Sequence, residues 1–162
     1  MTFDVANPVI ALCVAGVERE GNPAEALALY ERAWAARTDD FDASVAAHYV
    51  ARLQPTPGMT LHWNAVALRH AELVTDARVA TLLPSLCLNL AESYRLAGRA
   101  EESRRVARLG HNALAGLPAD GYAAMVRGGL ERVLAHLATA GVSIPHVQST
   151  AAPRDAAGQI AM

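Results

Sequence analysis

Two histidines and an asparagine in one stretch, His62, Asn64 and His70, are residue types that could bind a metal ion or transfer protons. His62 and His70 are eight residues apart, so on a helix they share roughly one face but lie about 12 Å apart along the axis. That separation is too large for a shared metal ion. The sequence also has no H-E-x-x-H motif and no cysteine and histidine spacing typical of zinc. We therefore expect no metal site.

Nucleophilic catalysis and phosphate binding require equally specific motifs. The sequence contains neither a Gly-x-Ser-x-Gly elbow nor a glycine-rich strand-to-helix loop. The pair Gly128 and Gly129 lies inside a predicted helix, where glycine costs stability, and indicates close helix packing. These observations favour a protein that works by binding and has neither catalytic residues nor a cofactor.

Several residues admit two interpretations from the sequence. Asn64 is either a buried, hydrogen-bonded bridge or a catalytic group, and the bridge is the commoner role for an asparagine on an apolar face. Trp63 is either part of the core or a stacking platform for a ligand. Cys13 and Cys87 have no CxxC partner, so we expect free, packed thiols in preference to a disulfide.

The elements that must position these residues are helices. The composition is 52% hydrophobic but only 5% aromatic, and Ala and Leu, which dominate the hydrophobic part, favour helices most. Apolar residues recur at helical spacing and predict seven helices. They cover about 8–20, 23–34, 42–53, 57–76, 78–97, 100–115 and 120–140. Asn7, Asn22 and the acidic stretch 39–42 supply N-caps, and Pro84 predicts either a kink or a helix start nearer Leu83.

Two segments repeat one order of residue types. Residues 21–33 contain a turn glycine followed by a small residue, an aromatic residue and a small residue, namely Ala26, Tyr30 and Ala33. Residues 90–103 carry Leu90, Ala91, Tyr94 and Gly98 at matching offsets, with Ser103 where alanine is usual. This order resembles the tetratricopeptide repeat, over about residues 8–116.

The resemblance is weakest in the middle helix pair. Gly21 and Gly98 are 77 residues apart, which exceeds two 34-residue repeats and requires an insertion. His48 stands where a small residue is expected, and Asn64 where an aromatic residue is expected. The resemblance implies an all-α, right-handed α-solenoid of about three divergent helix pairs, with a seventh capping helix. The domain then covers residues 1–141, and 142–162 form a tail that we expect to be disordered.

In tetratricopeptide repeats the first helix of each pair lines a concave groove, which singles out the polar residues of the third and fifth helices. Asn89 matches the groove asparagine that holds a terminal carboxylate in some family members. The basic partners of that site are not reproduced, because the first helix is apolar there. Asn89 could equally satisfy partners between helices. The candidate binding residues are Asp42, Tyr49, Arg52, Asn64, Ser85, Asn89, Glu92 and Arg95.

The resemblance implies a non-catalytic interaction module that binds a peptide or protein partner in this groove, or that forms a homodimer. The alternative is a small-molecule-binding or catalytic accessory protein with a polar pocket between the third and fifth helices. The net charge of -2 and the pI near 6.3 argue against nucleic acid and anionic membranes as partners. Residues 1–4 show no signal-peptide pattern, so we expect a cytoplasmic location.

Overall fold

Helices alone make up the regular structure of the described residues. The computed structural model describes residues 4–140, and the predicted tail at 142–162 lies outside them. The prediction of an all-α protein with seven helices is confirmed within this range. In chain order they are α1 (Pro8–Val17), α2 (Pro23–Ala36), α3 (Asp40–Ala51), α4 (Pro57–Ala71), α5 (Leu83–Leu96), α6 (Ala100–Ala113) and α7 (Gly121–Ala140). Two short 3-10 helices, η1 (Ala77–Val79) and η2 (Leu114–Gly116), lie between them.

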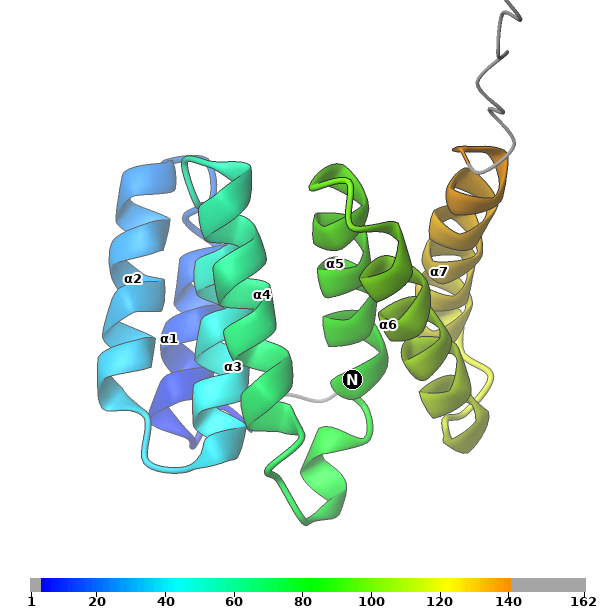
Figure 1. Cartoon of the computed structure of the whole chain (residues 1–162). Coiled ribbons are helices and arrows are strands. Elements are labelled where there is room, and N and C mark those ends of the chain that lie inside the picture. Colours follow the sequence, from blue (N-terminus) through cyan, green and yellow to red (C-terminus); the bar gives the residue numbers. More distant parts are fainter. Residues whose placement is uncertain (1–3, 141–162) are drawn as a thin grey trace, which may run out of the picture.

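The helices pack as sequential hairpins. α1 packs on α2, α3 on α4 and α5 on α6, while α7 contacts both α5 and α6. Because consecutive helices alternate in direction, α1, α3, α5 and α7 all run the same way (Figure 1). Their N-terminal ends therefore lie at one end of the molecule and their C-terminal ends at the other.

The predicted helix boundaries need two corrections. The fourth helix ends at Ala71 and not near 76, because Val74 and Thr75 are poor helix formers, and Asp76 then caps η1 through the Arg78 amide at 2.9 Å. The first helix ends at Val17 and not near 20. Of the two readings of Pro84, the helix start at Leu83 is confirmed, so the proline lies in the first turn of α5.

The caps follow the sequence in most places. The Asn7 side chain accepts hydrogen bonds from the amides of Val9 and Ile10, and Asp39 accepts one from the Asp42 amide. Asn22 precedes α2 as predicted, but its side chain makes no cap and donates to Glu25.

Gly98 ends α5 in a left-handed conformation, with φ +73°. Its amide donates to the Arg95 carbonyl, and the next amide, that of Arg99, donates to the Tyr94 carbonyl. These two bonds form a Schellman motif, in which glycine avoids the steric penalty of a positive φ. The prediction that Gly98 stops the fifth helix is confirmed.

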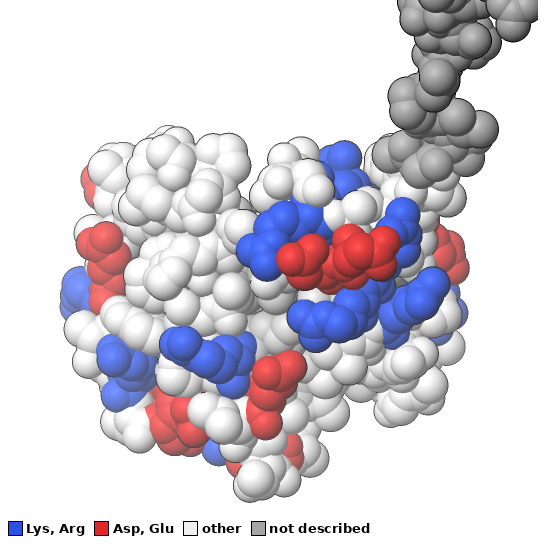
Figure 2. Space-filling model, viewed as in Figure 1, with Lys and Arg blue, Asp and Glu red and all other residues white. Residues whose placement is uncertain are grey.

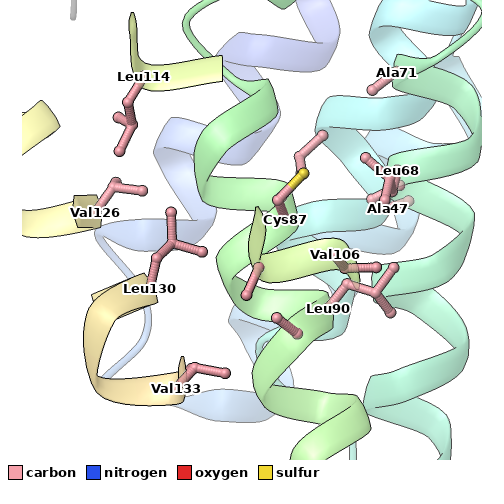
Figure 3. Close-up of a cluster of buried hydrophobic side chains, with 14 of the residues drawn as sticks. Ala47, Leu68, Ala71, Cys87, Leu90, Val106, Leu114, Val126, Leu130 and Val133 are labelled. Atoms are coloured by element: carbon pink, nitrogen blue, oxygen red, sulfur yellow. The ribbon is translucent and has the colours of Figure 1, made fainter. Parts of the chain in front are cut away.

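The main apolar core runs across α4, α5, α6 and α7. Figure 3 shows Cys87 between Leu68 and Ala71 on one side and Leu130 on the other. Both cysteines are free and buried, which confirms that prediction, and burial raises the pKa of each thiol to about 12. Trp63 packs edge-on against Trp34, with ring centroids 5.0 Å apart, as expected of a core residue. No helix among the described residues is long and apolar enough to span a bilayer.

A candidate binding groove between α3 and α5

A groove of about 720 Å³ runs between the helices that share one direction. α3 and α5 form its walls, and α1 and the first turns of α7 contribute at the sides. Most of its surface is apolar, although many of the lining residues carry a polar group. The apolar lining residues are Ile10, Phe41, Val45, Leu82, Leu88, Met125 and Val126.

The groove lies where two neighbouring helices separate. α1 packs on α3 and α5 packs on α7, but α3 and α5 have no comparable close packing. The two walls are held at that spacing by α4, which packs on both of them. An open cavity therefore lies between α3 and α5, whereas α1 and α3, and α5 and α7, pack directly on each other.

A second, smaller cavity of about 250 Å³ adjoins the groove between α3, α4 and α5. Its lining includes Asn64, Glu92 and Ser93. His48, Arg52 and Asn89 line both cavities. These three side chains therefore stand at the boundary between the groove and the smaller cavity.

His48 and Asn89 face each other across the boundary. The Asn89 Nδ2 lies 3.4 Å from His48 Nδ1, so with the amide as donor the imidazole carries its proton on Nε2. Burial, together with the charge of Arg52, lowers the pKa of His48 to about 4. His48 is therefore a neutral hydrogen-bonding group at neutral pH, and not a cation.

Arg52, at the end of α3, is held by an ion pair. Its Nε and Nη2 donate to the two carboxylate oxygens of Glu20 at 2.8 and 2.9 Å, and Glu20 also accepts from the Tyr30 hydroxyl at 2.8 Å. The hydrogen bonds from Arg52 lower the pKa of Glu20. This bidentate pairing balances the charge of Arg52 and uses two of its five N–H donors.

Arg78 lies at the opposite end of the groove and is also held by ion pairs. Its Nη2 lies 3.0 Å from Asp39 and 2.9 Å from Asp76, and its guanidinium stacks on the Phe41 ring at 4.6 Å. The two aspartates also cap α3 and η1. The positive charge at this end is thus balanced by groups that the helix N-termini require.

The candidate residues from the sequence fall into three groups. Tyr49, Arg52, Ser85 and Asn89 line the groove. Asn64 and Glu92 line the smaller cavity. Asp42 and Arg95 line neither.

Asp42 is buried and has a local structural role. It accepts hydrogen bonds from the Asn7 side chain at 2.7 Å and from the Thr38 amide and hydroxyl at 3.1 and 2.8 Å. These bonds tie the start of α1 to the start of α3. Its carboxylate is therefore saturated from within the protein.

Arg95 pairs with Glu92 one turn away, and this pairing lowers the pKa of Glu92. The pair belongs to a band of opposite charges over α5 and α6, which Figure 2 shows as adjoining blue and red side chains. Such exposed pairs one turn apart contribute little energy.

Asn64 is the buried bridge that the sequence favoured. Its Nδ2 donates to Ser93 Oγ at 3.0 Å, and this bond joins α4 to α5. Ser85, one of the groove residues, donates its own hydroxyl to the Leu82 carbonyl at 2.9 Å.

Sequence reasoning missed most of the groove lining, of which His48 and Met125 are two instructive examples. His48 was noted only because it interrupts the repeat pattern, and that interruption was the available signal. Met125 is an apolar residue at helical spacing in the seventh helix, which is typical of a buried face, but it lines the groove with 61% of its surface exposed. The error arose because an apolar residue at helical spacing does not reveal whether its face is covered.

Among the described residues no group of three or more His, Cys, Asp or Glu side chains lies close enough to hold a metal ion. No family model, curated protein or solved structure matches the chain. The site must therefore be interpreted from its own geometry.

Proposed function

We propose that the protein is a non-catalytic interaction module that binds a peptide or protein segment in the groove between α3 and α5. The observation that carries the proposal is the lining of the groove, whose open surface is mostly apolar and whose two arginines, Arg52 and Arg78, are paired within the protein. Such a surface suits the burial of apolar side chains from a partner. We further propose that the hairpins stack as a right-handed, tetratricopeptide-like solenoid. We also propose that the protein acts in the cytoplasm.

A library of displayed random dodecapeptides, selected on the immobilised protein, tests the proposal. Met125→Glu places a charge in the groove at an exposed position, so we expect the variant to fold and to lose at least tenfold in affinity for the selected peptides. Leu73→Glu is the matched control, because Leu73 is 57% exposed and lies outside the groove lining. Equal binding by both variants would contradict binding in the groove.

Self-association is the second part of the proposal. Val17, Met59 and Leu96 are large apolar residues that are 44%, 44% and 64% exposed. They lie at the C-terminal ends of α1 and α5 and at the start of α4, which is the same end of the molecule. Light scattering at increasing concentration should show a dimer for the wild type and a monomer for Leu96→Glu. A monomeric wild type would remove this part of the proposal.

The smaller cavity supports an alternative function. Arg52, Asn64, Asn89 and Glu92 converge there, as a small polar molecule would require. In that case the protein would be a small-molecule-binding or catalytic accessory protein. A thermal-shift screen of metabolites against the wild type and Glu92→Ala separates the alternatives, because Glu92 lines the smaller cavity and not the groove. A metabolite that stabilises only the wild type would favour the smaller cavity.

A further inference from the structure

His48 and Asn89 each have a hydrogen-bonding atom that their mutual contact does not use. The contact between His48 and Asn89 uses Nδ1 of the imidazole and Nδ2 of the amide. Among the described residues, His48 Nε2 and Asn89 Oδ1 have no partner, and neither atom is shut off from solvent. Both residues line the groove. The middle of the groove therefore offers one N–H donor and one carbonyl acceptor close together.

The arginines at the two ends of the groove, in contrast, are already paired with carboxylates of the protein. Arg52 is bound to Glu20, and Arg78 is bound to Asp39 and Asp76. A ligand carboxylate or phosphate would compete with these carboxylates for the two guanidinium groups. At neutral pH the His48 imidazole adds no positive charge, because burial lowers the pKa of His48 to about 4. Asp4, the third charged residue of the lining, is exposed and accepts a hydrogen bond from the Ala6 amide. Apart from Asp4, the charged groups of the groove are engaged within the protein, so its lining suits an uncharged segment.

We infer that the groove binds an internal, uncharged peptide segment in extended form, with the main-chain N–H and C=O of one residue bonded to Asn89 Oδ1 and His48 Nε2. The inference rests on the proposed function. A donor beside an acceptor matches the N–H and C=O of an extended main chain, whereas the main chain of a helix has already used both groups.

The dimensions of the groove agree with a short segment. Its lining follows α3 from Phe41 to Arg52, just past the end of the helix, and these eleven residue steps rise about 16 Å. An extended chain covers about 3.3 Å per residue, so about five residues fit along the wall. Apolar side chains of the segment would contact Val45, Leu82 and Leu88 on either side of the central amide.

An ester scan of a selected peptide tests the inference. The probe is the tightest dodecapeptide from a library displayed with polar linkers at both ends, then synthesised with acetylated and amidated termini. Each main-chain N–H is replaced in turn by an ester oxygen, and the Kd is measured by calorimetry. We expect one ester, near the centre, to weaken binding to the wild type about three- to tenfold.

The same ester should cause no further loss with Asn89→Leu, because the acceptor for that N–H is absent. Gln54→Leu is the matched control, because Gln54 is also an amide but lines neither cavity, so the ester effect should persist in that variant. The wild-type scan needs no variant, so a failure of Asn89→Leu to fold leaves the test intact.

Three outcomes would overturn the inference. In the first, the scan is flat. In the second, the ester penalty is the same in Asn89→Leu. In the third, the selected peptides require an acidic side chain or a free carboxyl terminus. In each of these cases peptides still bind, so the proposed function stands. A library that yields no binder would overturn both.

Discussion

The α5·α6 hairpin and the α3·α4 hairpin place their buried polar groups differently. In α5·α6, Ser103 donates to the Ala91 carbonyl at 2.7 Å, so the bond stays inside the pair. In α3·α4, His48 and Asn64 both bond to side chains of the neighbouring α5. Ser103 thus bonds within its own hairpin, whereas His48 and Asn64 join the α3·α4 hairpin to α5 through Asn89 and Ser93. These contacts of His48 and Asn64 with α5 form a polar joint between the two hairpins. The groove lies at that joint, so the irregularity and the candidate site coincide.

The close packing inside α5·α6 gives the largest expected effect. A Cβ atom added at Gly110 would lie 2.6 Å from the Cys87 Cβ, which cannot move without its helix. Gly110→Val should therefore lower the free energy of unfolding by about 3 kcal/mol, measured by urea denaturation. Gly128→Val is the matched control, since only the Arg132 guanidinium lies near that position, at 3.5 Å. Similar losses in the two variants would mean that α5 and α6 tolerate separation.

The titration of His48 should make the joint sensitive to pH. Its folded pKa of about 4 lies below the ordinary value of 6.5, so the unfolded chain takes up a proton first as the pH falls. The free energy of unfolding should therefore decrease by about 2 kcal/mol from pH 7 to pH 4. This decrease is smaller than the full pKa shift would give, because His48 is only partly covered. Urea denaturation at several pH values measures this.

His48→Gln is the control for the pH effect, and it should flatten the dependence between pH 5 and 7. Glu20 and Glu92 have lowered pKa values, so their stabilising contribution is lost only below about pH 4.5, outside that window. An unchanged slope in His48→Gln would assign the dependence to another group.

The bond between Asn64 and Ser93 should matter more than a bond within one hairpin. Asn64→Ala leaves Ser93 Oγ without its donor and opens space at the joint, so we expect a loss of about 1.5 kcal/mol in urea denaturation. Replacing both partners, as Asn64→Leu with Ser93→Ala, should recover most of that loss, since no unpaired polar atom remains. If the double variant is as unstable as the single one, packing and not the hydrogen bond joins α4 to α5.

These contrasts also mark how far the sequence could predict the structure. Helical spacing and caps such as Asn7 and Gly98 predicted the seven helices, because such signals act within a few residues. The buried bridge at Asn64 followed from an amide on an apolar face. The resemblance predicted a groove lined by the third and fifth helices, but the spacing of its walls depends on how α4 packs on both of them, which no local pattern gives. Asp42 was chosen for its expected face, but its saturation by Asn7 and Thr38 is a tertiary contact that no local pattern shows.

The smallest effect is expected within the regular hairpin. Ser103→Ala removes the bond to the Ala91 carbonyl, but that carbonyl lies within α5 and the substitution leaves almost no empty space, so the loss should be about 0.5 kcal/mol. Ser103→Val should cost more, because the position is fully buried and has no room for added methyl groups. If Ser103→Ala costs as much as Asn64→Ala in the same urea assay, then the bond inside the hairpin is as important as the bond between hairpins. The polar joint would then no longer distinguish the α3·α4 hairpin from its neighbour.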